Sequence, residues 1–224
     1  MATGETSRQP AKLAELAPGV TAAFVREALH RAIHGVGPLP PAAAAADKQL
    51  KEQKGDVDRA VHEVIENHVR YAGAQGFLTN LGGLATMAYM VPANITGLAL
   101  VQSRMVAGIA HLRGYDLTDP RVRNAVLVSM LGEEAVLDLV RAQKIPAPPM
   151  ALATAPAFDP MLDRVISAEV AADLVAKVAG KRVAGSAARR IPLVGGLVGA
   201  GADGYATWRV GRYADRELLP LRRR

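Results

Sequence analysis

A run of 33 residues without a charged side chain, 71–103, constrains this chain more than any other feature. It is bounded by Arg70 and Arg104. A helix of about 20 apolar residues crosses a bilayer, so the run is long enough for a membrane span. It also contains five glycines and several polar amides, which lower its hydrophobicity. The run could therefore form one of three structures: part of a soluble core, a membrane insert or a ligand pocket.

Pro92 lies in the middle of the uncharged run. Proline lacks the backbone N–H and clashes with the preceding helical turn, so a helix stops or kinks there. We therefore predict a helix over about 79–90, a second over about 93–112, and a helical hairpin bent at Pro92. The hairpin is either packed inside the protein or inserted shallowly in a membrane.

A second apolar run rich in small residues occupies residues 191–208, near the C-terminus. Both runs contain a Gly-Gly-Leu step, at Gly82-Gly83 and at Gly195-Gly196. Small residues let helices approach closely, in water and in lipid. The pattern predicts two Gly-rich helical hairpins, which either pack against each other or share a role in binding.

Composition favours helices over strands. Half of the residues are hydrophobic, only 4% are aromatic, and Ala, Leu and Arg, which favour helices, are abundant. No segment shows a convincing alternation of apolar and polar residues. We predict an all-α multi-helix bundle. The absence of cysteine excludes disulfides, thiolate metal sites and a cysteine nucleophile.

Positive charge is concentrated at the C-terminal end. The net charge is +6, and residues 177–224 hold 11 Lys/Arg against 3 Asp/Glu, which gives +8, leaving −2 for the remainder. A basic segment beside an apolar run suits an anionic membrane surface. A solvated basic end that keeps the chain soluble is the alternative. Nucleic acid is not expected, because few aromatic side chains accompany the basic residues.

Proline, glycine and charge divide the chain into segments. We expect a flexible N-terminal arm over 1–18, a single helical domain over 19–218 with a Pro-rich loop at 145–160, and a basic tail over 219–224. The first residues lack the apolar core of a secretory signal. A cytoplasmic location follows as an expectation, including the inner face of the cell membrane.

Helix start signals place the remaining elements. We expect helices over about 20–35 and 42–53, and one starting after an N-cap at Asp56. Asp119-Pro120 and Asp159-Pro160 each combine a cap with proline at the first helical position. The helices that follow them are expected over about 120–142 and 160–178, and a last helix ends near Leu218.

Motifs that would carry chemistry are weak. Residues 199–204 match G-x-G-x-x-G, but only 20 residues follow, too few for the βαβ unit that a dinucleotide site requires. His30 with His34, and His62 with His68, sit among charged residues on helices, where a solvated face competes with a metal site or a pH-sensitive contact. No catalytic residue, metal or cofactor is predicted.

Two stretches resemble the EcsC family. The first, residues 72–127, has a helix leading into Gly76-Phe77, the Gly82-Gly83 step, Pro92 before a long helix, and GYDL at 114–117 before Asp119-Pro120. The second is IPLVGGLVGAGADGYATWRVGRYA, at 191–214, which is similar to the family's Gly-rich closing segment. Together the resemblance covers most of 56–215. It implies a bacterial protein associated with an ABC transporter, and it supplies no catalytic residues.

Taken together, the sequence predicts a non-enzymatic helical protein that binds a membrane surface, a lipid or a membrane protein. A soluble helical module that binds an apolar small ligand is the alternative, and a metal-dependent enzyme is a third possibility. Pairing with a second copy of the chain is compatible with the small-residue faces. The residues expected to bind lipid or a partner are Gly82, Gly83, Pro92, Asn94, Arg104, Arg182, Arg189, Arg190, Gly195, Gly196, Asp203, Trp208 and Arg212.

Overall fold

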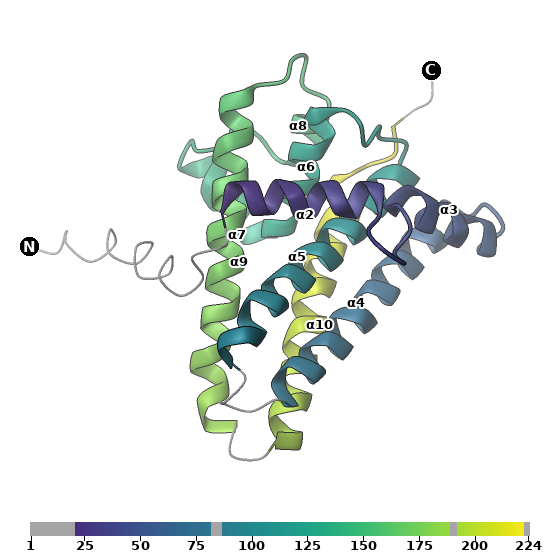
Figure 1. The fold of residues 1–224 in the computed structure, drawn as a ribbon. Coiled ribbons are helices and arrows are strands. Elements are labelled where there is room, and N and C mark those ends of the chain that lie inside the picture. Colours follow the sequence, from purple (N-terminus) through teal and green to yellow (C-terminus); the bar gives the residue numbers. More distant parts are fainter. Residues whose placement is uncertain (1–20, 82–86, 189–191, 222–224) are drawn as a thin grey trace, which may run out of the picture.

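The computed structural model describes residues 21–81, 87–188 and 192–221, and the side chains of 21–74, 95–177 and 201–221. Across these residues the chain forms nine α-helices and no strand, which confirms the predicted all-α helical bundle (Figure 1). The helices are α2 (Ala22–His34), α3 (Ala42–Glu52), α4 (Val57–Leu81), α5 (Met87–Leu112), α6 (Pro120–Leu131), α7 (Glu133–Arg141), α8 (Pro149–Ala153), α9 (Pro160–Ala188) and α10 (Pro192–Glu217). The predicted N-terminal arm lies outside the described residues.

Helix α5 forms the centre of the core. Ile95, Met105 and Ile109 on this helix are fully buried. It packs against α2, α3, α4, α6, α9 and α10, while α4 and α10 form the most extensive helix pair. Helix α2 crosses the front of the bundle in Figure 1. The apolar faces of all these helices therefore meet in one continuous core.

The ends of α4, α5 and α10 are tied together by Arg113. Its guanidinium donates to the carboxylates of Asp58 and Asp215, each at 2.7 Å. The backbone N–H of Leu221 donates to the Arg113 carbonyl at 2.9 Å, which holds the segment after α10 against the end of α5. Arg113 thereby fixes three helices at one end of the bundle.

Three predicted helix starts have the expected caps. The Oδ1 atom of Asp56 accepts from the N–H of Arg59 at 3.0 Å, at the start of α4. Asp119 and Asp159 accept in the same way at the starts of α6 and α9. Each cap satisfies a backbone donor that the first helical turn leaves without a partner.

The predicted helix over 120–142 is wrong in its continuity. Gly132 has φ +84° and separates α6 from α7. Glycine adopts this conformation at low cost, so it ends one helix and starts the next. Glu133 and Glu134 then occupy the first turn of α7, where the helix dipole favours negative charge.

The predicted position of the hairpin turn, at Pro92, is also wrong, as is the predicted helix over 79–90. Helix α4 continues to Leu81, and α5 begins at Met87 and runs through Pro92. The helical hairpin exists, but its two helices meet across residues 82–86, which lie outside the described residues. Pro92 is in the second turn of α5, where its missing N–H removes one hydrogen bond rather than ending the helix.

The Pro-rich segment over 145–160 is packed against the core. It contains the short helix α8, and Ile145, Leu152 and Ala153 are buried. Helix α8 contacts α6. The segment therefore follows the surface of the same bundle between α7 and α9.

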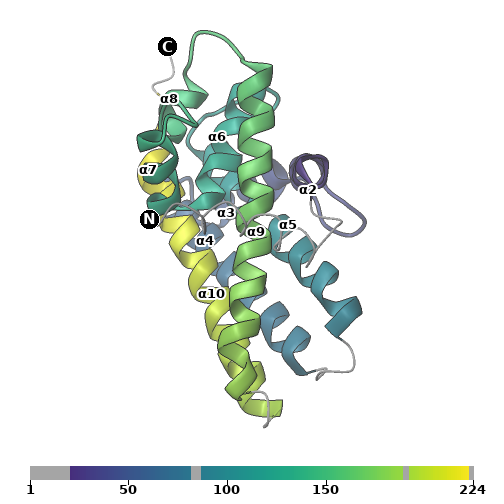
Figure 2. The ribbon, with the colours of Figure 1, turned by 90° about the vertical axis from the view of Figure 1, so that its left-hand side faces the viewer.

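Two helical hairpins point toward the same end of the molecule. The end of α4 and the start of α5 lie there, as do the end of α9 and the start of α10 (Figures 1 and 2). Helices α6, α7 and α8 lie toward the opposite end. We call the first end, made of 75–81, 87–94, 178–188 and 192–200, the hairpin end.

Among the described residues, one helical segment has the length and composition of a membrane span. It is Ile95–Leu112 in α5, with a mean hydropathy of 1.3, and 67% of it is buried inside the protein. This segment is the part of α5 that forms the centre of the core.

Candidate functional site

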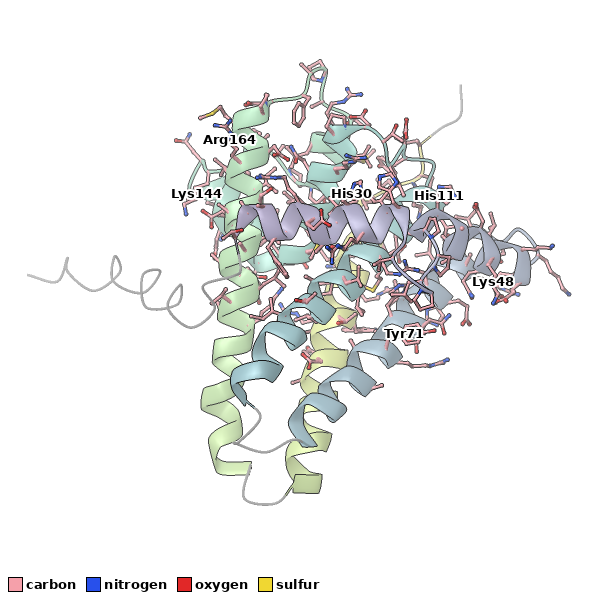
Figure 3. The ribbon with its side chains drawn as sticks, viewed as in Figure 1. His30, Lys48, Tyr71, His111, Lys144 and Arg164 are labelled. Atoms are coloured by element: carbon pink, nitrogen blue, oxygen red, sulfur yellow. The ribbon has the colours of Figure 1, made fainter. Side chains whose placement is uncertain are left out.

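An apolar cleft opens between α3, α4 and α5. Its volume is about 650 Å³, within the range of small-ligand sites. Alanines of α3 leave the space open on one side. The apolar walls are formed by Leu39, Ala42, Ala45, Val64, Leu100 and Val101, and the polar groups are Lys48, Gln49, Asn67, His68, Tyr71 and Arg104. We call this the α3–α5 cleft; Lys48 and Tyr71 are labelled beside it in Figure 3.

Arg104 is the buried cation of this cleft. The residue is 8% exposed, and one guanidinium nitrogen donates to the carbonyl of Pro40. Within the described part of the chain, no carboxylate lies within ion-pairing distance of it. Burial lowers the pKa of Arg104, yet arginine stays protonated in proteins. The cleft therefore holds a positive charge without a described counterion.

His68 is the second titratable group in the cleft. Its Nδ1 lies 2.7 Å from the carbonyl oxygen of Val64. A carbonyl only accepts, so Nδ1 carries the proton of the neutral ring. Burial, together with a smaller effect from the charge of Arg104, lowers the pKa of His68 to about 4. At neutral pH the imidazole is uncharged, and Arg104 is the buried charge.

A second groove lies between α7 and α10, with a volume of about 600 Å³. Its charges are paired with one another. Arg209 contacts Glu134 at 3.1 Å, and Arg216 contacts Glu133 at 2.5 Å. Trp208 is 41% exposed and stacks on Tyr205, with ring centroids 5.9 Å apart. This groove thus differs from the α3–α5 cleft, because its cations are already neutralised.

The structure separates Arg212 from the other predicted cations. Its guanidinium lies in the α7–α10 groove, 3.4 Å from the carboxylate of Asp215. At 1.5 Å per residue it is about 30 Å along α10 from the start of that helix. Arg182, in contrast, lies on the hairpin-end part of α9, and Arg189 and Arg190 fall between α9 and α10, outside the described residues.

The hairpin end is defined by backbone and sequence. The chain has no charge over 71–103, and over 174–202 it has five Lys/Arg and no Asp/Glu. Gly195 and Gly196 lie in the first turns of α10, and Pro92 and Asn94 in the first turns of α5. Gly82 and Gly83 lie outside the described residues. The fold brings these helix ends together, while Arg104, Trp208 and Arg212 lie elsewhere.

Asp203 is buried in the core rather than presented to a partner. The residue is 1% exposed, one turn before Thr207 on α10, which is also buried. The amide of Gln102 on α5 donates to the Thr207 hydroxyl at 3.5 Å. The polar residues of the two Gly-rich runs therefore meet between α5 and α10.

The described histidines do not form a cluster of three or more metal-ligating side chains. No three His, Cys, Asp or Glu side chains within the described ranges come close enough to hold a metal ion. The rings of His30 and His34 lie 4.3 Å apart on the exposed face of α2, and Figure 3 labels His30 there. His111 instead contacts the carboxylate of Asp47 at 2.7 Å.

Sequence reasoning named Arg104 but missed the rest of its cleft. The sequence pairs His68 with His62 on a charged helix face, and it marks residues 42–53 only as a helix. Two features of the sequence could have indicated the cleft. One is a polar side chain inside an apolar helical stripe, and the other is a run of alanines too small to fill the space that faces it.

A scan against protein-family models, a search of curated proteins and a search of solved structures all find no match to this chain.

Proposed function

We propose that this protein binds an anionic membrane surface through its hairpin end. The observation that carries the proposal is the joint placement of the two Gly-rich helical hairpins. Each was predicted separately from sequence, and the fold directs both toward one end of the molecule (Figures 1 and 2). That end combines apolar sequence with basic residues and has no acidic residue over 71–103 or 174–202.

This combination suits a membrane for two physical reasons. Apolar helix ends gain free energy when they leave water for the acyl boundary. Each Lys or Arg near an anionic surface adds about 1 kcal/mol. Acidic residues would oppose both effects, since they repel anionic head groups and are costly to desolvate.

The rest of the fold is consistent with attachment by one end. The span-like segment Ile95–Leu112 is mostly buried within the bundle. A peripheral protein with shallow hairpins is therefore favoured over one that crosses the bilayer through this helix. We place the attachment at the inner face of the cell membrane. We also propose that the chain is an EcsC-type protein, and the membrane association of that family agrees with this location.

Binding to vesicles tests the proposal. We expect the protein to co-sediment with vesicles of mixed phosphatidylcholine and phosphatidylglycerol, and less with phosphatidylcholine alone. Replacing Arg182, Arg189 and Arg190 by Gln removes about 3 kcal/mol of attraction, so binding is expected to weaken about 100-fold. Binding should also fall with added salt, which screens exposed charges.

A matched variant controls for net charge. Replacing Lys51, Arg141 and Arg164 by Gln removes three exposed positive charges away from the hairpin end; Figure 3 labels Arg164 at the far end of α9. This variant should bind within about threefold of the native protein, since its changes lie beyond a Debye length of about 10 Å from the surface. Equal loss in both variants would show a non-specific charge effect. No binding to anionic vesicles by the native protein would favour a membrane protein as the partner.

A further inference from the structure

We propose that the α3–α5 cleft binds a fatty acid, with its carboxylate paired to Arg104 and its acyl chain against the apolar walls. This site is separate from the hairpin end, so it goes beyond membrane attachment. The proposal rests on three observations. Arg104 is a buried cation with no carboxylate partner among the described residues, the apolar space has a suitable size, and the cleft holds one buried charge for a ligand to neutralise.

The first step concerns the charge of Arg104. An arginine has five N–H donors, and the described residues give this one a single hydrogen bond, to the Pro40 carbonyl. Arg104 lines the cleft and its other guanidinium nitrogens are not fully buried, so they remain available to an anion. A buried charge without a counterion is costly. An anion in the cleft removes that cost.

The second step concerns the class of anion. Arg104 is the buried charge, because His68 is neutral at physiological pH and Lys48 at the mouth is exposed and 3.8 Å from Glu52. A carboxylate carries one negative charge, which one guanidinium neutralises in bidentate geometry. A phosphate head would bring about −1.5 to −2. The cleft therefore matches a carboxylate.

The third step concerns the rest of the ligand. The cleft measures about 650 Å³, and its apolar walls include alanine, leucine and valine side chains from α3, α4, α5 and the segment just before α3. Burying each methylene of an acyl chain contributes about 0.8 kcal/mol. The side-chain amides of Gln49 and Asn67 also line the cleft and can donate to the second carboxylate oxygen.

Calorimetric titration of the full-length protein with laurate tests the proposal. We expect one saturable site. Dodecanol and dodecyltrimethylammonium, which have the same chain without a negative head, should bind at least about tenfold more weakly. Arg104→Gln should weaken laurate binding at least about tenfold, and Lys48→Gln, which removes an exposed charge at the mouth, less than about threefold.

A second variant keeps the test independent of Arg104. Ala45→Phe adds a large side chain on the cleft wall, so it should abolish laurate binding while the protein keeps its helical content and melting temperature. The proposal is overturned if laurate shows no saturable binding, if dodecanol binds as well as laurate, or if dodecyl phosphate binds more than about tenfold tighter. Unchanged laurate affinity in Ala45→Phe would also overturn it.

Discussion

Arg104 and His68 show how burial gives neighbouring residues opposite electrostatic roles. Arginine keeps its proton when it is buried, so Arg104 remains a cation. Histidine has an ordinary pKa near neutrality, and burial lowers the pKa of His68 to about 4, so its ring is neutral at physiological pH. The two side chains therefore place one positive charge in the α3–α5 cleft.

The shifted pKa of His68 makes stability depend on pH. Unfolded, the ring binds a proton below pH 6.5, whereas folded it does so only near pH 4. The unfolded state thus binds more protons between these values, and the free energy of unfolding falls as the pH is lowered through them. We expect a loss of about 2 kcal/mol from His68 between about pH 7.5 and pH 5.

Urea denaturation at both pH values measures this effect. His68→Gln has no ring to titrate, so its stability should depend on pH less steeply than that of the native protein, by about the same 2 kcal/mol. Identical pH dependence in the two proteins would show that His68 titrates normally and that the cleft is well hydrated.

At the scale of helices, the sequence is informative where side chains act locally. Asp119 and Asp159 cap the first turn through their own carboxylates, so α6 and α9 begin where predicted. The break at Gly132 is indicated only by a glycine followed by two glutamates. The apolar pattern continues on both sides of it, so periodicity alone predicts one helix. Whether a helix ends at Pro92 depends on how far Pro92 lies from the start of that helix, and the local sequence does not indicate this distance.

The cleft shows the same limit. Arg104 could be named from its position at the edge of the uncharged run. Its neighbours in space come from α3 and α4, more than 30 residues earlier in the chain for His68 and more than 50 for Ala45. Helix-to-helix contacts decide which faces meet, so a pocket between three helices does not follow from periodicity alone.

The contact of α10 with α4 and α5 depends on Gly211. A methyl group there would lie 3.0 Å from Cγ1 and Cγ2 of Ile65 and from Sδ of Met105, and both neighbours are buried. Overpacking of this kind costs about 1–3 kcal/mol. We expect Gly211→Ala to lower the free energy of unfolding by up to about 2 kcal/mol, after about 1 kcal/mol of better helix propensity is subtracted.

Gly201, on the same helix, provides the matched control. A methyl group there meets nothing within 4 Å. Gly201→Ala should raise stability by up to about 1 kcal/mol through helix propensity. Thermal or urea unfolding compares the two, and equal effects at both positions would contradict the tight packing at Gly211.

At the scale of the whole molecule, the chain separates two kinds of surface. Paired charges gather between α7 and α10, where Arg209 and Arg216 contact two glutamates. The hairpin end has basic and apolar sequence without acids. Sequence analysis found both Gly-rich runs but left open whether they meet lipid, a ligand or each other. The fold sets their helices at one end, which makes a single attachment surface the simplest account.

The most direct test of this account is the environment of that surface on vesicles. The chain has no cysteine, so single cysteines can carry an environment-sensitive fluorophore at Thr79 in α4 and Ser186 in α9, one in each hairpin, and at Ala151 in α8 as the control. We expect anionic vesicles to shift the emission to shorter wavelength at Thr79 and Ser186 and to leave Ala151 unchanged. A shift at Ala151 alone, or none in either hairpin while the protein is vesicle-bound, would contradict attachment through the hairpin end.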